Sequence, residues 1–97
     1  MKYADIQIAG NHPAFAGHFP GTPIVPGALL LDEVLNAIAA SEGIAAERCK
    51  IPSAKFKRMV GPGEPLILGF EFTGPGAVRF ELRSAADVVA DGMVLFR

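Results

Sequence analysis

One segment of this chain, residues 28–41, is rich in helix-forming residues and apolar almost all the way round. Its sequence is ALLLDEVLNAIAAS, which begins just after a Pro-Gly pair and is followed by a Glu-Gly stop; the polar side chains inside it are Asp32, Glu33 and Asn36. Such a helix needs burial on several sides. The rest of the 97-residue chain must therefore provide a surface that wraps around it.

Strand-like segments provide that surface. Residues 3–9 alternate apolar and polar side chains with one slip, as a half-buried strand does. Four more segments follow the helix, at 53–60, 65–73, 77–89 and 93–97, and the turns between them are Gly61-Pro62-Gly63, Gly74-Pro75-Gly76 and Asp91-Gly92. Turns of this kind favour antiparallel hairpins. The sequence predicts one α+β domain over residues 1–97, with one long buried helix wrapped by a curved antiparallel sheet.

The composition restricts both the assembly and the partners. Hydrophobic residues make up 51% of the chain and charged residues only 20%, which is more apolar surface than a small single-layer fold can hide. This excess favours a homo-oligomer. The formal net charge of -1 and the pI near 6.1 give no electrostatic reason to bind nucleic acid.

The chain shows no sign of a metal site, a disulfide or a membrane span. Cys49 is the single cysteine, and no Cys/His cluster has the spacing of a zinc site. The amino-terminal residues lack the apolar core of a signal peptide, and no apolar run approaches the roughly 20 residues that cross a bilayer. We therefore expect a cytoplasmic protein without a resident metal.

Residues 15–32, FAGHFPGTPIVPGALLLD, contain the side chains with the clearest chemical potential. His18 lies in a loop rich in proline and glycine, and Asp32 follows inside the apolar helix. The two could form an acid/base pair. They could equally be a loop histidine and a solvated or capping carboxylate, and the residue pattern alone favours this second interpretation.

The same segment resembles a known family. The stretch from Gly17 to Asp32 follows the pattern GHFPGxPxxPGxLxLD, with Asp or Glu at its end, that is found in hotdog-fold 3-hydroxyacyl-[acyl-carrier-protein] dehydratases. The matching positions are Gly17, His18, Phe19, Pro20, Gly21, Pro23, Pro26, Gly27, Leu29, Leu31 and Asp32. A weaker likeness continues in AKFKRMVGPGEPL, residues 54–66. The resemblance implies a hydro-lyase that converts a 3-hydroxyacyl thioester to a trans-2-enoyl thioester and water, in fatty acid or related lipid, polyketide or aryl-polyene synthesis.

The resemblance also implies a role for three residues. His18 matches the catalytic base, which removes a proton next to the thioester carbonyl. Asp32 matches the catalytic acid, which protonates the departing hydroxyl, and burial on an apolar helix would favour the protonated carboxyl that this step needs. Gly27 matches the position whose backbone N–H binds the thioester oxygen, where the unpaired N–H groups and the positive end of the helix dipole stabilise developing negative charge.

The resemblance further implies how the substrate is held. The acyl chain would enter an apolar tunnel, for which the candidates are Phe15, Phe19, Ile24, Val25 and Phe56, although each could be ordinary core. No cofactor is expected, because the substrate is carried on the phosphopantetheine of acyl carrier protein or on coenzyme A. The basic cluster Lys50, Lys55, Lys57 and Arg58 could contact an acidic carrier protein or could simply be solvated.

Members of the family form their site across a dimer interface, so the resemblance implies a homodimer and leaves room for a higher assembly of dimers. Two other functions stay open at this point. Hotdog folds also include acyl thioesterases, although these generally lack the histidine motif. A non-catalytic acyl-binding subunit is the other alternative, although the chain retains both the acid and the base.

Overall fold

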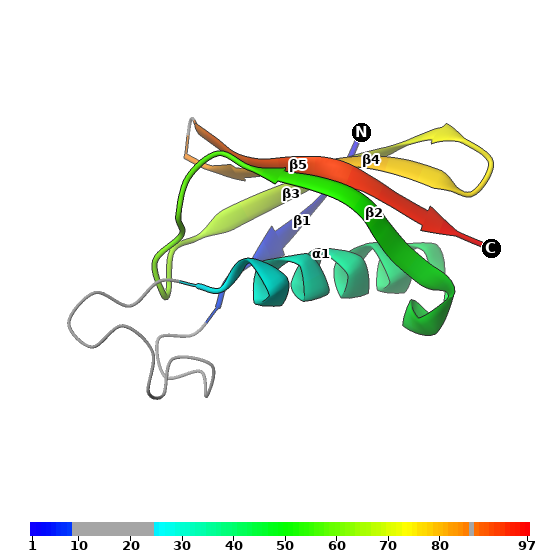
Figure 1. The fold of residues 1–97 in the computed structure, drawn as a ribbon, viewed down its shortest axis with the longest axis horizontal. Coiled ribbons are helices and arrows are strands. Elements are labelled where there is room, and N and C mark those ends of the chain that lie inside the picture. Colours follow the sequence, from blue (N-terminus) through cyan, green and yellow to red (C-terminus); the bar gives the residue numbers. More distant parts are fainter. Residues whose placement is uncertain (9–24, 86) are drawn as a thin grey trace.

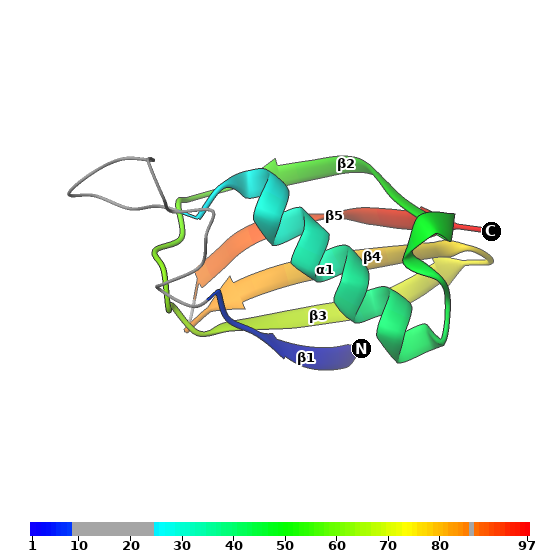
Figure 2. The same cartoon turned by 90° about the horizontal axis from the view of Figure 1, so that it is seen from below.

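The computed structural model describes residues 1–8, 25–85 and 87–97, which form one helix packed on one antiparallel sheet (Figure 1). Its elements in chain order are β1 (Lys2–Ile6), α1 (Gly27–Glu42), the short 3₁₀ helix η2 (Ala46–Arg48), β2 (Cys49–Phe56), β3 (Leu66–Gly74), β4 (Ala77–Ser84) and β5 (Asp87–Phe96). The strand order is β1-β3-β4-β5-β2, and all neighbouring strands are antiparallel. Figure 2 shows α1 crossing the sheet diagonally. The predicted hotdog architecture is confirmed.

Local sequence explains where α1 begins and ends. Pro26 precedes the first turn with φ of -58°, a value that its ring imposes and that suits a helix start. At the other end Gly43 adopts a left-handed conformation with φ of 66°. Its N–H donates to the Ala40 carbonyl, and the Ile44 N–H donates to the Ala39 carbonyl at 2.9 Å. These bonds satisfy carbonyl groups that the end of a helix would otherwise leave unpaired.

The core lies between α1 and the face of the sheet that α1 covers. Alternate residues of β4 point toward the helix and are fully buried, namely Val78, Phe80 and Leu82. The helix contributes Leu30, Val34 and Ile38 to the same cluster. Since successive side chains of a strand point to opposite faces, the intervening β4 positions carry polar groups on the outer face.

The described residues bury one side of α1. Asp32, Asn36 and Ala40 are exposed on the opposite side, while Leu31 and Leu35 are half-buried. Burial of the helix on several sides was expected from its apolar composition. The described part of a single chain covers one side and leaves the apolar flanks partly open to solvent.

The prediction of a turn at Asp91-Gly92 is wrong. Both residues lie inside β5, and β4 ends at Ser84, so the chain reverses near Ala85. Gly92 is needed for packing, because a Cβ there would lie 2.4 Å from the Ser53 carbonyl oxygen and 2.9 Å from Phe80 Cε2. Here the glycine marks a close approach of two strands and a ring.

The predicted bounds of the strand after the helix are also shifted. The sequence placed it at residues 53–60, whereas β2 runs from Cys49 to Phe56. Pro52 lies in the middle of β2, where a missing N–H is tolerated because β2 is an edge strand. The ladder shifts register between Lys50 and Ser53, on either side of this proline.

We predict that Gly92→Ala lowers the free energy of unfolding by about 1–3 kcal/mol, because the added methyl group must displace backbone or the Phe80 ring. Gly74→Ala is the matched control, since no heavy atom lies within 4 Å of a Cβ at that position. We expect it to change stability by less than about 0.5 kcal/mol. Urea denaturation of both variants would measure the difference. Equal stability of the two would contradict the packing role of Gly92.

Candidate active site

The structure places four of the predicted site residues. Val25, Gly27, Asp32 and Phe56 are described. The predicted base His18 and the tunnel candidates Phe15, Phe19 and Ile24 lie outside the described residues.

A pocket of about 410 Å³ lies at the amino-terminal end of α1. It unites three predicted site residues, Val25, Gly27 and Phe56, which come from the helix start and from the end of the edge strand β2. The other lining residues are Pro26, Leu30, Lys57, Arg58, Met59 and Val60. The pocket is thus apolar over much of its wall and has two basic side chains at its β2 side.

Gly27 lies against the outer edge of the Phe56 ring. A Cβ at position 27 would lie 3.1 Å from Phe56 Cζ and 3.2 Å from Cε2, so glycine allows the ring to cover the helix start. The N–H groups of Gly27 and Ala28 have no hydrogen-bond acceptor among the described residues. These two N–H groups lie at the positive end of the helix dipole, where they could bind an anionic oxygen.

Asp32 lies on the exposed side of α1. It does not line the pocket at the helix start. The burial expected for Asp32 is therefore not supplied by the described part of one chain. The physical reason is the orientation of the helix, which turns Leu30 and Val34 toward the sheet and Asp32 away from it.

The turn between β2 and β3, residues 57–65, forms one wall of the pocket. Glu64 holds this turn in place. The Glu64 carboxylate accepts hydrogen bonds from the Arg58 guanidinium, from the Ser84 hydroxyl and from the Gly61 N–H, the last at 3.2 Å. The Arg58 and Ser84 hydrogen bonds lower the pKa of Glu64 from 4.5 to about 2. Glu64 therefore stays ionised at neutral pH.

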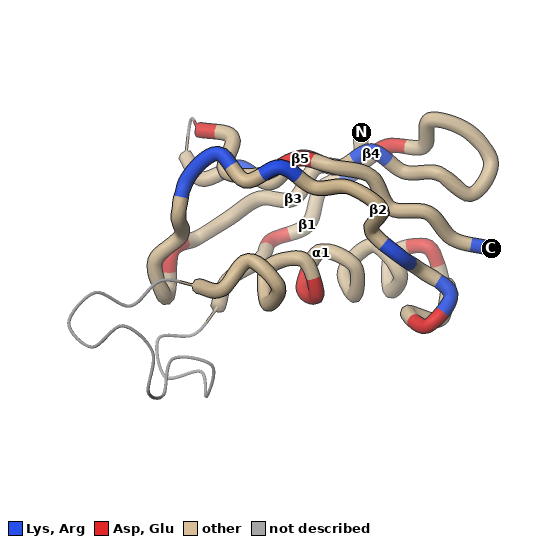
Figure 3. The backbone as a smooth tube through the Cα atoms, in the orientation of Figure 1, with Lys and Arg blue, Asp and Glu red and all other residues tan. Residues whose placement is uncertain are grey.

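The predicted basic cluster divides into two kinds of residue. Lys57 pairs with Asp91 at 3.3 Å, and Arg58 pairs with Glu64. The Lys50 and Lys55 side chains make no hydrogen bond or ion pair with another described residue. Figure 3 shows basic residues following β2 and the turn after it along one edge of the sheet. Internal ion pairs thus partly neutralise the cluster, and Lys50 and Lys55 are left available for a partner.

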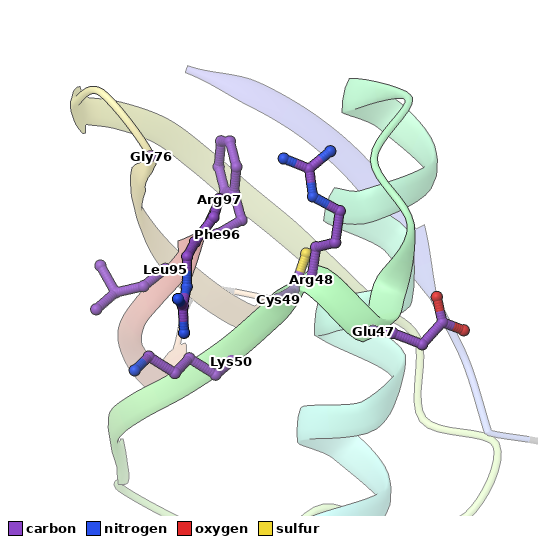
Figure 4. A pocket seen from close by; sticks show the side chains of 8 residues that line it. All are labelled: Glu47, Arg48, Cys49, Lys50, Gly76, Leu95, Phe96 and Arg97. Carbon is purple, nitrogen blue, oxygen red and sulfur yellow. The ribbon is translucent and has the colours of Figure 1, made fainter.

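A second pocket, of about 580 Å³, lies at the opposite end of α1 and contains none of the predicted catalytic or tunnel residues. It is lined by Glu47, Arg48, Cys49, Lys50, Gly76, Leu95, Phe96 and Arg97. Figure 4 shows the Arg48 and Lys50 side chains on different sides of this pocket, so the two cations do not converge. The larger pocket is therefore a weaker candidate than the pocket at the helix start.

The described residues also bear on two other kinds of feature, a metal centre and a membrane span. They contain no group of three or more His, Cys, Asp or Glu side chains arranged to hold a metal ion. None of their helices is both long and apolar enough to cross a membrane.

Sequence reasoning missed the turn residues that shape the pocket. Met59 and Val60 line it, and Glu64 orders the turn that carries them. The pattern Gly61-Pro62-Gly63 was interpreted as a simple hairpin connection. The glutamate that follows it was the available clue, because a carboxylate beside a glycine-rich turn can accept hydrogen bonds from the turn's N–H groups.

Solved structures agree with the hotdog class that the helix, the curved sheet and the pocket define. A chain of the dehydratase heterocomplex ApeI:P from Xenorhabdus doucetiae superposes with a TM-score of 0.77 at 21% identity, over 98% of this chain and 86% of that one. The fluoroacetyl-CoA-specific thioesterase FlK superposes with a TM-score of 0.67 at 8% identity, over 99% of this chain and 89% of that one. At such low identities these likenesses establish the fold.

Sequence comparisons identify the family within that class. The chain belongs to the ApeI-like dehydratase family, whose model matches residues 2–93. It is 37% identical to the 3-hydroxyacyl-[acyl-carrier-protein] dehydratase FabZ of Chlamydia trachomatis, over 96% of this chain and 69% of that protein. It is 38% identical to the enzyme of the same name from Acetivibrio thermocellus, over 93% of this chain and 69% of the relative. The protein is thus a dehydratase.

Proposed function

We propose that this dehydratase removes water from a 3-hydroxyacyl thioester carried on acyl carrier protein and releases a trans-2-enoyl thioester for fatty acid or related synthesis. The observation that carries the proposal is the pocket at the start of α1, where the Gly27 N–H, which has no acceptor among the described residues, lies beside an apolar wall in a member of a dehydratase family. A thioester carbonyl at this position would receive hydrogen bonds as negative charge develops on its oxygen.

The proposed chemistry couples two proton transfers, one from the carbon beside the thioester carbonyl and one to the hydroxyl on the next carbon. Neutral His18 takes the proton from the carbon beside the carbonyl, and the electron pair left behind is delocalised onto the oxygen held by the Gly27 N–H. The carbon–oxygen bond to the 3-hydroxyl then breaks as Asp32 donates a proton to it. Water leaves, and the double bond forms between the two carbons. No cofactor is needed for this balance.

We propose that the working unit is a homodimer in which Asp32 of one subunit serves the pocket of the other. Three observations support this arrangement. Asp32 is exposed and does not line the pocket of its own chain. The half-buried Leu31 and Leu35 flank it and would gain burial against a partner. Among the described residues the edge strand β2, next to the pocket, pairs with β5 alone.

The proposed reaction also indicates an acyl carrier protein as the partner and the cytoplasm as the compartment. Acyl carrier proteins are acidic, so the Lys55 side chain, which precedes the pocket residue Phe56 at the end of β2, could contact one near the pocket entrance. Lys50 lies at the other end of β2 and lines the second pocket. Coenzyme A thioesters are the alternative substrate form. We place the enzyme in the cytoplasm and expect an acyl tunnel that begins with Val25 and Phe56.

The first test measures enoyl-thioester absorbance while the purified protein acts on short and medium 3-hydroxyacyl thioesters. We predict that His18→Ala and Asp32→Asn each lower kcat by at least about 100-fold, because each removes one proton transfer. Glu33→Gln, which changes the neighbouring carboxylate, should retain activity. Release of free thiol would indicate a thioesterase. The absence of any turnover by folded wild-type protein would indicate a binding subunit.

Mixing the two inactive variants tests the shared site. If His18 and Asp32 of different subunits form each site, a mixed dimer of His18→Ala and Asp32→Asn contains one intact site and one site lacking both groups. After subunit exchange at equal concentrations, we expect roughly a quarter of the wild-type activity to return. No recovery, with exchange verified by native mass spectrometry, would place both residues of a site in one chain.

Charge reversal tests the carrier contact. We predict that Lys55→Glu raises KM for a carrier-bound substrate by about fivefold and leaves KM for the matching coenzyme A thioester within about twofold. Arg79→Glu, which alters an ion pair on the outer face of β3 and β4, is the control. An unchanged KM for the carrier-bound substrate would remove the contact.

A further inference from the structure

The turn between β2 and β3 holds the chain just before the segment 9–24. The Gly63 N–H donates to the Ile8 carbonyl oxygen at 2.6 Å, and the Gln7 side-chain amide donates to the Gly63 carbonyl oxygen at 2.6 Å. The N–H and the C=O of Gly63 thus both form hydrogen bonds with the last two residues before that segment. Ile8 is buried in the core cluster, so its position is set by packing as well as by hydrogen bonding.

The same turn holds the chain just after the segment. The Val25 N–H donates to the Val60 carbonyl oxygen at 2.7 Å, and both residues are buried. Only Pro26 separates Val25 from Gly27, the proposed binding site for the thioester oxygen. A displacement of the Val60 carbonyl would therefore be transmitted to the helix start within two residues.

Glu64 in turn holds this turn against the sheet. Its carboxylate accepts from the Gly61 N–H at 3.2 Å within the turn, and it accepts from the hydroxyl of Ser84, a buried residue at the end of β4. It also pairs with Arg58, whose guanidinium donates to the Met59 carbonyl oxygen at 2.7 Å. One carboxylate thus links the turn, the end of β2 and the sheet, through charge-assisted hydrogen bonds.

We propose that Glu64 is a positioning residue for the dehydratase site, because its carboxylate fixes the turn that holds Ile8 and Val25. This inference rests on the proposed function, in which the N–H of Gly27, two residues after Val25, binds the thioester oxygen. Glu64 touches no reacting atom. Its effect passes through the backbone hydrogen bonds of Val60 and Gly63.

The first variant for the test is Glu64→Gln, which keeps the size of the side chain. An amide offers one acceptor oxygen where the carboxylate offers two, and its NH₂ group would face the donors of Arg58 or Ser84. Ser84→Ala is the second variant and removes one hydroxyl from the network while leaving Glu64 in place. Glu71→Gln is the matched control, because it breaks a surface pair with Arg79 at 3.2 Å that is not part of the turn.

Steady-state kinetics and amide hydrogen exchange are measured on all three variants well below their unfolding temperatures. We expect Glu64→Gln to lower kcat by about 10-fold with KM within about twofold, since misplaced groups slow the chemical step. Ser84→Ala should lower kcat less, and Glu71→Gln should match the wild type. In Glu64→Gln the Val25 and Gly63 amides should exchange faster, while the Phe80 amide in β4 keeps its wild-type rate.

Unchanged kcat in Glu64→Gln, with active wild type, would overturn the positioning role and leave the proposed function standing. Faster exchange at Phe80 as well as at Val25 would also overturn it, because the loss would then reflect general destabilisation. A wild type that forms no enoyl product would instead overturn the proposed function and with it the role of Glu64. If Glu64→Gln does not fold, the same comparison is made with Ser84→Ala.

Discussion

Burial of one side of an apolar helix in a curved sheet is the interaction on which the rest of this structure depends. Leu30, Val34 and Ile38 of α1 pack against alternate residues of β4, including Phe80 and Leu82, and none of these side chains is appreciably exposed. Burial of each such side chain contributes on the order of 1.5–3 kcal/mol. This packing decides which end of α1 faces the pocket and which residues of α1 stay outside.

The helix and the fold class could be predicted because they depend on local patterns. Helix-forming composition, the preceding proline and the following glycine located α1 to within one residue at each end. Strand bounds were less predictable, since pairing is settled by distant contacts. Gly92 has the local appearance of a turn residue, and only the neighbouring Ser53 and Phe80 show why a strand needs glycine there.

In the candidate site, too, single residues could be predicted from local sequence, whereas their surroundings depend on distant contacts. Gly27 and Phe56 were predicted separately, and the structure brings them together because β2 ends beside the start of α1. The surroundings of Asp32 could not be predicted from the apolar character of the helix, because that character does not say which side the sheet covers. The role of Glu64 was not predicted, because the tertiary fold brings its partners Arg58 and Ser84 together and no sequence motif marks them.

The proline in the edge strand β2 has a consequence for how this protein meets other chains. An edge strand with an unbroken row of N–H and C=O groups can pair with almost any extended segment, which leads to indiscriminate aggregation. Pro52 removes one donor from the middle of β2, and the ladder shifts register beside it. A strand that adds to this edge must match that interruption. The proline therefore protects this edge against indiscriminate strand addition.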